Sequence, residues 1–105
     1  MDRIPTLLAL LEKNPTDDFL QHALALEYIK INKAEDAVEL FEKLLLRNPE
    51  YVGSYYHIAK LLVSLNRTQE AEGWYEKGLQ AAKKAGDNHA FNELRAAYDE
   101  LLEDM

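Results

Sequence analysis

The fold is decided by a stretch that this chain contains twice: residues 14–45 read NPTDDFLQHALALEYIKINKAEDAVELFEKLL, and residues 48–79 read NPEYVGSYYHIAKLLVSLNRTQEAEGWYEKGL. At an offset of 34 residues the copies share Asn-Pro and Glu-Lys pairs, two alanines and a central asparagine. The identical positions are Asn14-Pro15 and Asn48-Pro49, Ala25 and Ala59, Asn32 and Asn66, Ala37 and Ala71, and Glu42-Lys43 and Glu76-Lys77. A fixed period of this size indicates one supersecondary unit stacked on copies of itself.

The apolar spacing predicts helices almost throughout, with regular breaks between them. We expect six antiparallel helices, joined by short turns into a right-handed stack. Five have approximate bounds of 4–13, 18–30, 34–47, 51–65 and 89–102, and a longer one fills the interval between the breaks at 66–68 and 86–88. The Asn-Pro pairs end helices because a residue before proline is disfavoured in the α conformation. Thr16, Asp17 and Asp18 supply capping and first-turn acidic groups for the second helix.

Two features predict how these helices pack. One helix carries apolar residues at i, i+1, i+4, i+7 and i+8, which places them on one face. This expected buried stripe is Ala37, Val38, Phe41, Leu44 and Leu45. Gly78 lies inside a helix, where glycine costs about 1 kcal/mol relative to alanine. We therefore expect close approach of a neighbouring helix at Gly78.

Composition and charge limit the class of protein. The chain has 105 residues, 4 glycines, 3 prolines and no cysteine. The lack of cysteine excludes a disulfide framework or thiolate metal site and fits a reducing compartment, so we expect a cytoplasmic protein. No signal-peptide pattern and no apolar run long enough to span a membrane is present. The net charge of −7 disfavours nucleic acid and anionic membranes as partners.

The repeat resembles the tetratricopeptide repeat, whose pattern is W-x2-L-G-x2-Y, then A-x3-F, then P. The first copy matches it with Gln21, Leu24, Ala25, Tyr28, Ala37, Phe41 and Pro49. The second matches with Tyr55, Ile58, Ala59, Leu62, Ala71 and Tyr75, and a half copy with Phe91, Leu94, Arg95 and Tyr98. Gln21 replaces a large aromatic residue. Arg95 replaces a small one, which suggests that nothing packs closely behind the last helix.

The resemblance implies an all-α, right-handed α–α superhelix that forms a single domain over residues 1–105. Its parts would be an N-terminal half-repeat at 4–13, repeats at 18–51 and 52–85, and a capping helix at 88–103. In this family the first helix of each pair lines a concave groove that binds a peptide or partner protein. The corresponding groove residues here are Phe19, His22, Leu26, Ile29, Tyr56, Lys60, Val63, His89 and Asn92.

Other functions have less support in the sequence. A family subclass grips acidic chaperone tails through lysines and asparagines, but His22, Leu26, His57, His89 and Glu93 occupy those sites here. The three histidines lack the short ligand spacing of a metal site. No phosphate loop or nucleophile motif is present, so we expect neither an enzyme nor a cofactor. The main alternative is a homodimer or a fragment of a longer superhelix, suggested by the apolar segment 4–11 and by Tyr51, Tyr55 and Tyr56.

Overall fold

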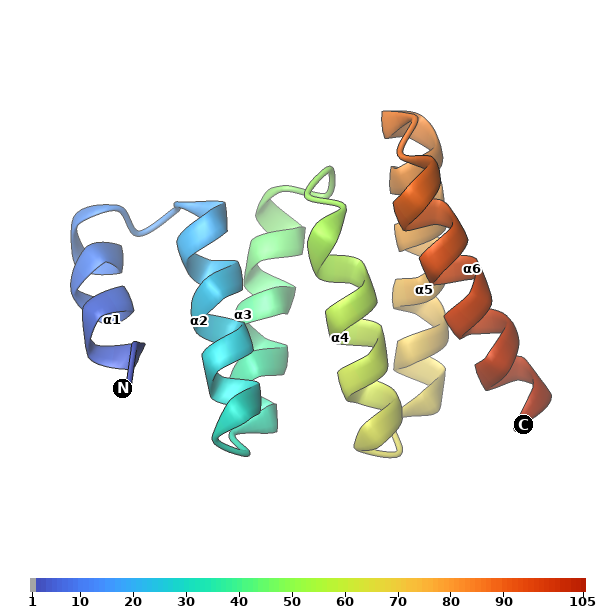
Figure 1. Ribbon diagram of the computed structural model, residues 1–105, viewed down its shortest axis with the longest axis horizontal. Coiled ribbons are helices and arrows are strands. Elements are labelled where there is room, and N and C mark those ends of the chain that lie inside the picture. Colours follow the sequence, from blue (N-terminus) through green and yellow to red (C-terminus); the bar gives the residue numbers. More distant parts are fainter. Residues whose placement is uncertain (1) are drawn as a thin grey trace. The chain divides into compact units, whose positions relative to one another are not determined.

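A computed structural model describes residues 2–105, and this part of the chain contains six helices and no strand (Figure 1). The all-α prediction is therefore confirmed. The helices are α1 (Ile4–Lys13), α2 (Asp18–Lys30), α3 (Ala34–Arg47), α4 (Gly53–Ser64), α5 (Thr68–Ala85) and α6 (Asn88–Glu103).

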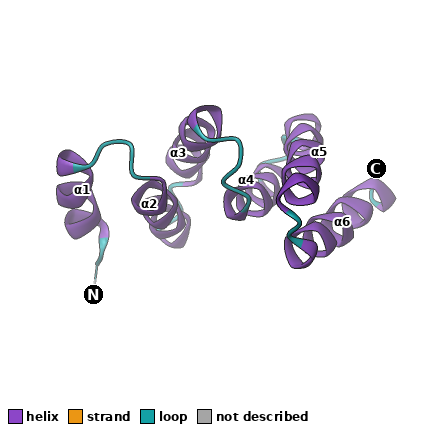
Figure 2. Cartoon of the chain, turned by 90° about the horizontal axis from the view of Figure 1, so that it is seen from above, coloured by secondary structure: helices purple, strands orange, loops and turns teal. Residues whose placement is uncertain are grey.

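The helices fall into two compact units that divide between Asn48 and Pro49. In the first unit, α2 packs against both α1 and α3. In the second unit, α5 packs against α4 and α6, and α4 also contacts α6. Successive helices within each unit run antiparallel, and Figure 2 shows α5 on one side of the pair formed by α4 and α6. A single domain over residues 1–105 stays a prediction.

Local side-chain chemistry explains where the helices begin and turn. The Asp17 carboxylate caps α2 by accepting a hydrogen bond from the Leu20 amide at 3.0 Å. The two mid-repeat asparagines, Asn32 and Asn66, adopt left-handed backbone conformations with φ of 63° and 61°. Asparagine tolerates this conformation better than most residues. The repeated asparagine therefore forms the same tight turn in both copies.

The expected buried stripe of α3 is confirmed, since all five of its residues are buried. The four alanines that recur in the repeat are fully buried as well; they are Ala25, Ala37, Ala59 and Ala71. Small side chains allow paired helices to approach closely, and this close packing explains why alanine recurs at these positions.

Gly78 lies where α5 meets α4 and α6. A methyl group added to it would lie 2.7 Å from the Tyr55 Cβ and 3.2 Å from a Leu94 methyl carbon. The expected close approach is therefore present. Gly73, one turn and a half earlier on α5, has no atom within 4 Å of the same added carbon, so packing does not explain that glycine.

The bounds predicted for the fourth helix were wrong by one or two residues. The helix expected at 51–65 spans Gly53–Ser64 as α4, because the amides of Ser54 and Tyr55 bond to the carbonyls of Tyr51 and Val52 in a tighter turn before the helix. The last helix spans Asn88–Glu103, which matches the expected capping helix at 88–103 and exceeds the approximate 89–102 by one residue at each end. It begins at Asn88 because the Asp87 carboxylate caps it through the Ala90 amide at 3.0 Å.

Candidate functional site

In the first unit, the expected groove residues lie on α2. Phe19 and His22 are three residues apart and Leu26 and Ile29 follow at helical spacing, which places them along one side of the helix. Phe19 is 66% exposed, whereas His22, Leu26 and Ile29 are half-buried. The His22 ring makes an edge contact with the Phe41 ring, whose centroid lies 5.6 Å away. This face therefore combines an exposed aromatic ring with partly covered apolar groups.

In the second unit, the expected groove residues come from α4 and α6, which contact each other. Tyr56, Lys60 and Val63 follow one another at i, i+4 and i+7 on α4. Tyr56 and Val63 are half-buried and Lys60 is exposed, as are His89 and Asn92 on α6. These five residues therefore belong to two helices that contact each other, and the three polar ones are exposed.

His57 lies beside this α4 face and experiences two opposing effects. Its burial lowers the pKa of the imidazole, and the nearby Glu93 carboxylate on α6 raises it; burial is the larger effect and the net shift is downward. The Tyr56 ring contacts the His57 ring edge-on with centroids 5.8 Å apart. His57 is therefore held neutral near pH 7 between α4 and α6.

The histidines do not form a metal centre in the part of the chain that the structure describes. No group of three His, Cys, Asp or Glu side chains among residues 2–105 could hold a metal ion. His22 instead contacts Phe41, and His57 contacts Tyr56. Within the same residues, no helix is long and apolar enough to cross a membrane.

The sequence did not predict a polar cluster that joins the start of α2 to the end of α3. Gln21 is 8% exposed; its amide donates to the Pro15 carbonyl and its oxygen accepts from the Arg47 guanidinium, both at 3.0 Å. Arg47 also pairs with the Asp18 carboxylate, which accepts a 2.7 Å hydrogen bond from the Asn48 amide. We call these residues, Asp18, Gln21, Arg47 and Asn48, the polar clasp.

The clasp also sets the ionisation of Asp18. Burial by itself would raise the pKa of this carboxyl group. Hydrogen bonds from Asn48 and Arg47, together with the Arg47 charge, outweigh burial and lower the pKa below its ordinary value. Asp18 is therefore ionised and binds the Arg47 guanidinium and the Asn48 amide where α2 begins and α3 ends.

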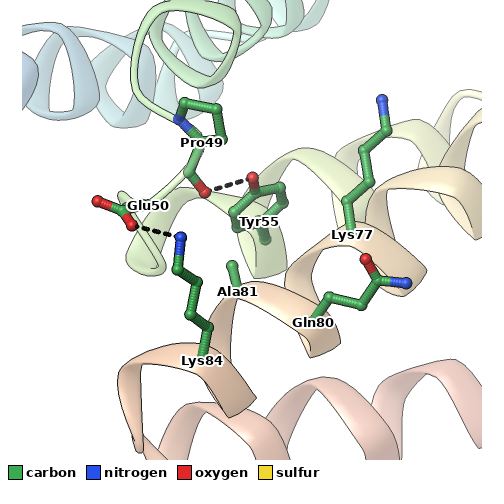
Figure 3. Close-up of a pocket in the computed structure, with 7 residues that line it drawn as sticks. All are labelled: Pro49, Glu50, Tyr55, Lys77, Gln80, Ala81 and Lys84. Carbon is green, nitrogen blue, oxygen red and sulfur yellow. Dashed lines mark hydrogen bonds and ion pairs between the residues drawn. The ribbon is translucent and has the colours of Figure 1, made fainter.

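In the second unit, a hollow of about 240 Å³ lies between α5 and the segment that leads into α4 (Figure 3). The Tyr55 hydroxyl donates a 2.6 Å hydrogen bond to the Pro49 carbonyl at its edge. Lys77, Ala81 and Lys84 of α5 line the hollow, and Lys84 pairs with Glu50 at 3.0 Å. None of the residues that the sequence predicted for a groove lies here.

A second hollow, of about 280 Å³, lies in the first unit between α1 and α3. It is mainly apolar, with Leu8 and Leu11 on one side, Leu40 on the other, and Leu24 and Tyr28 of α2 between them. Asp36, Glu39 and Lys43 stand around it, and the last two form an ion pair at 3.3 Å. The sequence predicted an apolar α1 but not this hollow.

Comparison with known proteins identifies the family. The family model described as the tetratricopeptide repeat matches residues 28–98, which is more than half of the chain. The chain belongs to the tetratricopeptide repeat family. The resemblance inferred from the 34-residue period is therefore confirmed.

Solved structures of tetratricopeptide repeat proteins agree with this assignment. The crystal structure of a tetratricopeptide repeat domain protein from Salinibacter ruber is 38% identical, with a TM-score of 0.79 over 83% of this chain and 97% of that one. A protein from Bordetella parapertussis, at 23% identity, shares the fold with a TM-score of 0.82 over 96% of this chain and 88% of its own. A search of curated proteins found no match.

Membership in the tetratricopeptide repeat family narrows the range of functions. Tetratricopeptide repeat proteins are typically non-enzymatic scaffolds, and their domains generally bind other proteins. The fold itself serves many unrelated partners, so the side chains that a particular chain exposes determine what it binds.

Proposed function

We propose that this chain is a non-catalytic, cytoplasmic interaction module that binds a peptide or partner protein in a concave groove. In the first unit the binding face would lie on α2, and in the second unit it would lie on α4 and α6. A bound segment would place an apolar side chain against Phe19 in the first unit or against Tyr56 in the second. Lys60 and Asn92 would fix its register through hydrogen bonds.

The exposure of Phe19 is the observation that carries this proposal. A phenylalanine that is 66% exposed adds nothing to the core of the first unit, yet α2 presents it beside partly covered apolar groups. Binding surfaces are enriched in large aromatic side chains, which bury much area when a partner covers them. Tyr56 supplies a similar half-covered ring on α4.

The charge of the α4 face supports the same proposal. Lys60 is an exposed cation in a chain of net charge −7, and it lies one helical turn from Tyr56. A basic group beside an aromatic ring suits a partner that combines an acidic and an apolar side chain. The arrangement resembles an interface core with a polar rim.

The proposal is tested by affinity capture from a lysate of the source organism. The wild-type chain is compared with a Tyr56→Ala/Lys60→Glu variant and with a Lys83→Glu variant, which makes the same charge change on exposed α5. Circular dichroism and thermal melting must show that all three fold equally well. A partner kept by the wild type and the Lys83 variant but lost by the double variant supports the proposal. Equal retention by all three contradicts it.

Self-association is a second candidate, favoured by α1. Its Leu8 and Leu10 side chains remain 45% and 42% exposed, so α1 presents apolar surface on more than one side. A second copy that covered them would form a homodimer. Light scattering over a wide concentration range distinguishes the two candidates, because a strict monomer at high micromolar concentration contradicts self-association.

A further inference from the structure

The two repeats differ at one corner, and this difference leaves a hollow in the second copy. In the first copy, Arg47 fills the space beside Gln21 and completes the polar clasp. The residue 34 positions later is Ala81, and Gln21 corresponds to Tyr55. Tyr55 bonds to Pro49 as Gln21 bonds to Pro15, but Ala81 has no long side chain to extend beside it as Arg47 extends beside Gln21. The result is the hollow of about 240 Å³, which we call the α5 pocket.

The α5 pocket has an apolar floor and a basic rim. The Pro49 ring and the Ala81 methyl group form the accessible floor, with the buried Tyr55 side chain behind them (Figure 3). Lys77 stands at one end, with its amino group 4.8 Å from the centre of the Trp74 ring, and Lys84 stands at the other. Two lysines against one glutamate give this rim a charge opposite in sign to the −7 of the whole chain.

The pocket continues along α5. An adjoining hollow of about 250 Å³ on α5 shares Glu50, Ala81 and Lys84 with the α5 pocket and adds Ala85. From Lys77 to Ala85 the helix rises about 12 Å, at 1.5 Å per residue. An extended peptide rises about 3.3 Å per residue, so roughly four residues would lie along the two hollows. This length suits a peptide segment better than a single small anion.

The Glu50–Lys84 ion pair lies where the two hollows meet and can be exchanged at little cost. The side chains of Glu50 and Lys84 are 70% and 76% exposed. Exposed ion pairs contribute little net stability because water and salt screen them. A carboxylate from a ligand could therefore replace Glu50 on Lys84 without disturbing the helices.

From these observations we propose that the α5 pocket binds a short extended peptide segment of another protein, in which an acidic side chain is flanked by apolar ones. The acidic group pairs with Lys84 in place of Glu50. The neighbouring apolar side chain lies over Pro49 and Ala81. This site is separate from the face of α4 and α6 and does not depend on the function proposed above.

The proposal is tested by adding capped peptides to the ¹⁵N-labelled full chain and recording amide NMR shifts. The probes are acetyl-Ala-Leu-Glu-Leu-Ala-amide, the same peptide with glutamine in place of glutamate, and free glutamate. The glutamate peptide is expected to shift amides within residues 49–55 and 77–85 and to bind about threefold to fivefold more tightly than the glutamine peptide. Free glutamate is expected to shift them little.

Three variants are expected to change the affinity for the glutamate peptide, two by weakening it and one by tightening it. Lys84→Gln weakens binding of the glutamate peptide by about threefold to fivefold, and Glu50→Gln tightens it by about the same factor because it removes the competing carboxylate. Ala81→Arg abolishes binding, since it fills the pocket as Arg47 does in the first copy. Lys83→Gln is the matched control, because it removes an adjacent exposed charge that does not line the pocket, and it leaves affinity unchanged.

Each contrary result overturns the proposal. Absence of shifts at 49–55 and 77–85, equal affinity for both peptides, or equal shifts with free glutamate would do so. Shifts confined to Tyr56, Lys60 and the α6 face would also overturn it, while supporting the groove proposed above. Loss of the groove partner in the lysate experiment has no bearing on these peptide shifts, so the two proposals can fail independently.

Discussion

The Gln21 side-chain amide donates a 3.0 Å hydrogen bond to the Pro15 carbonyl, and Tyr55 makes the equivalent bond to Pro49 at 2.6 Å in the second copy. Chemically different side chains thus tie the start of the repeat to the same carbonyl. The family pattern treats Gln21 as a mismatch because a large aromatic residue is expected there. In this chain it is a substitution that keeps the bond and adds a partner, Arg47.

We predict that Gln21→Ala lowers the free energy of unfolding by about 2 kcal/mol, because it removes both hydrogen bonds of a buried side chain. Urea unfolding followed by circular dichroism measures the change. Gln69→Ala is the control, since Gln69 is exposed on the first turn of α5 and should change stability little. Equal stability of the two variants would contradict a structural role for Gln21.

Asp18 should make the first unit sensitive to acid. Its folded-state pKa lies below the ordinary 3.8, so its contribution to stability is present above pH 3.8 and is lost as the pH falls through the folded-state value. We predict that Asp18→Asn is less stable than the wild type by about 1 kcal/mol at pH 7. The difference should shrink at pH 2–3. Urea midpoints at both pH values measure it, and a difference that does not change with pH would refute the prediction.

The period of the sequence predicted the helices and much of the core. Positions such as Ala25 and Ala59 recur because paired helices need small residues at the crossing, and this requirement is the same in both copies. The spacing along α3 likewise identified its buried face, with Phe41 at its centre. The repeat is informative about packing because equivalent positions in the two copies lie in the same packing environment.

The polar clasp and the α5 pocket could not be predicted from the 34-residue repeat. The polar clasp depends on Arg47 and the α5 pocket on Ala81, and these residues differ between copies. A search for shared residues passes over such positions. The environment of His57 was also missed, since its burial and its proximity to Glu93 arise from the packing of α4 on α6. A comparison of copies for differences would have singled out position 81, although not its neighbours in space.

The two glycines of α5 offer a matched pair of substitutions. Gly73→Ala should stabilise the protein by about 0.5–1 kcal/mol, because alanine restricts the unfolded chain and nothing lies within 4 Å of the added carbon. Gly78→Ala should destabilise it by about 1–2 kcal/mol, because the added carbon would lie 2.7 Å from the Tyr55 Cβ. Thermal or urea unfolding measures both changes. A stabilising Gly78→Ala would show that α4 can shift away from α5.

His57 should make stability fall in mildly acidic solution. Because burial lowers the pKa of its imidazole below the ordinary 6.5, the unfolded state binds a proton at a higher pH than the folded state does. Its contribution is present above pH 6.5 and is lost as the pH falls from there to the folded-state pKa. We therefore predict that the wild type loses more stability than His57→Gln between pH 7.5 and pH 5.

Urea unfolding of both proteins at several pH values measures this difference. The carboxyl groups titrate in both proteins, so subtracting one curve from the other isolates the histidine. Glu93→Gln provides a second check: it removes the carboxylate that raises the pKa of His57, so the imidazole should titrate at a still lower pH, as followed by NMR of the ring protons. Parallel stability curves for the wild type and His57→Gln would show that α4 and α6 open enough to hydrate the charged ring.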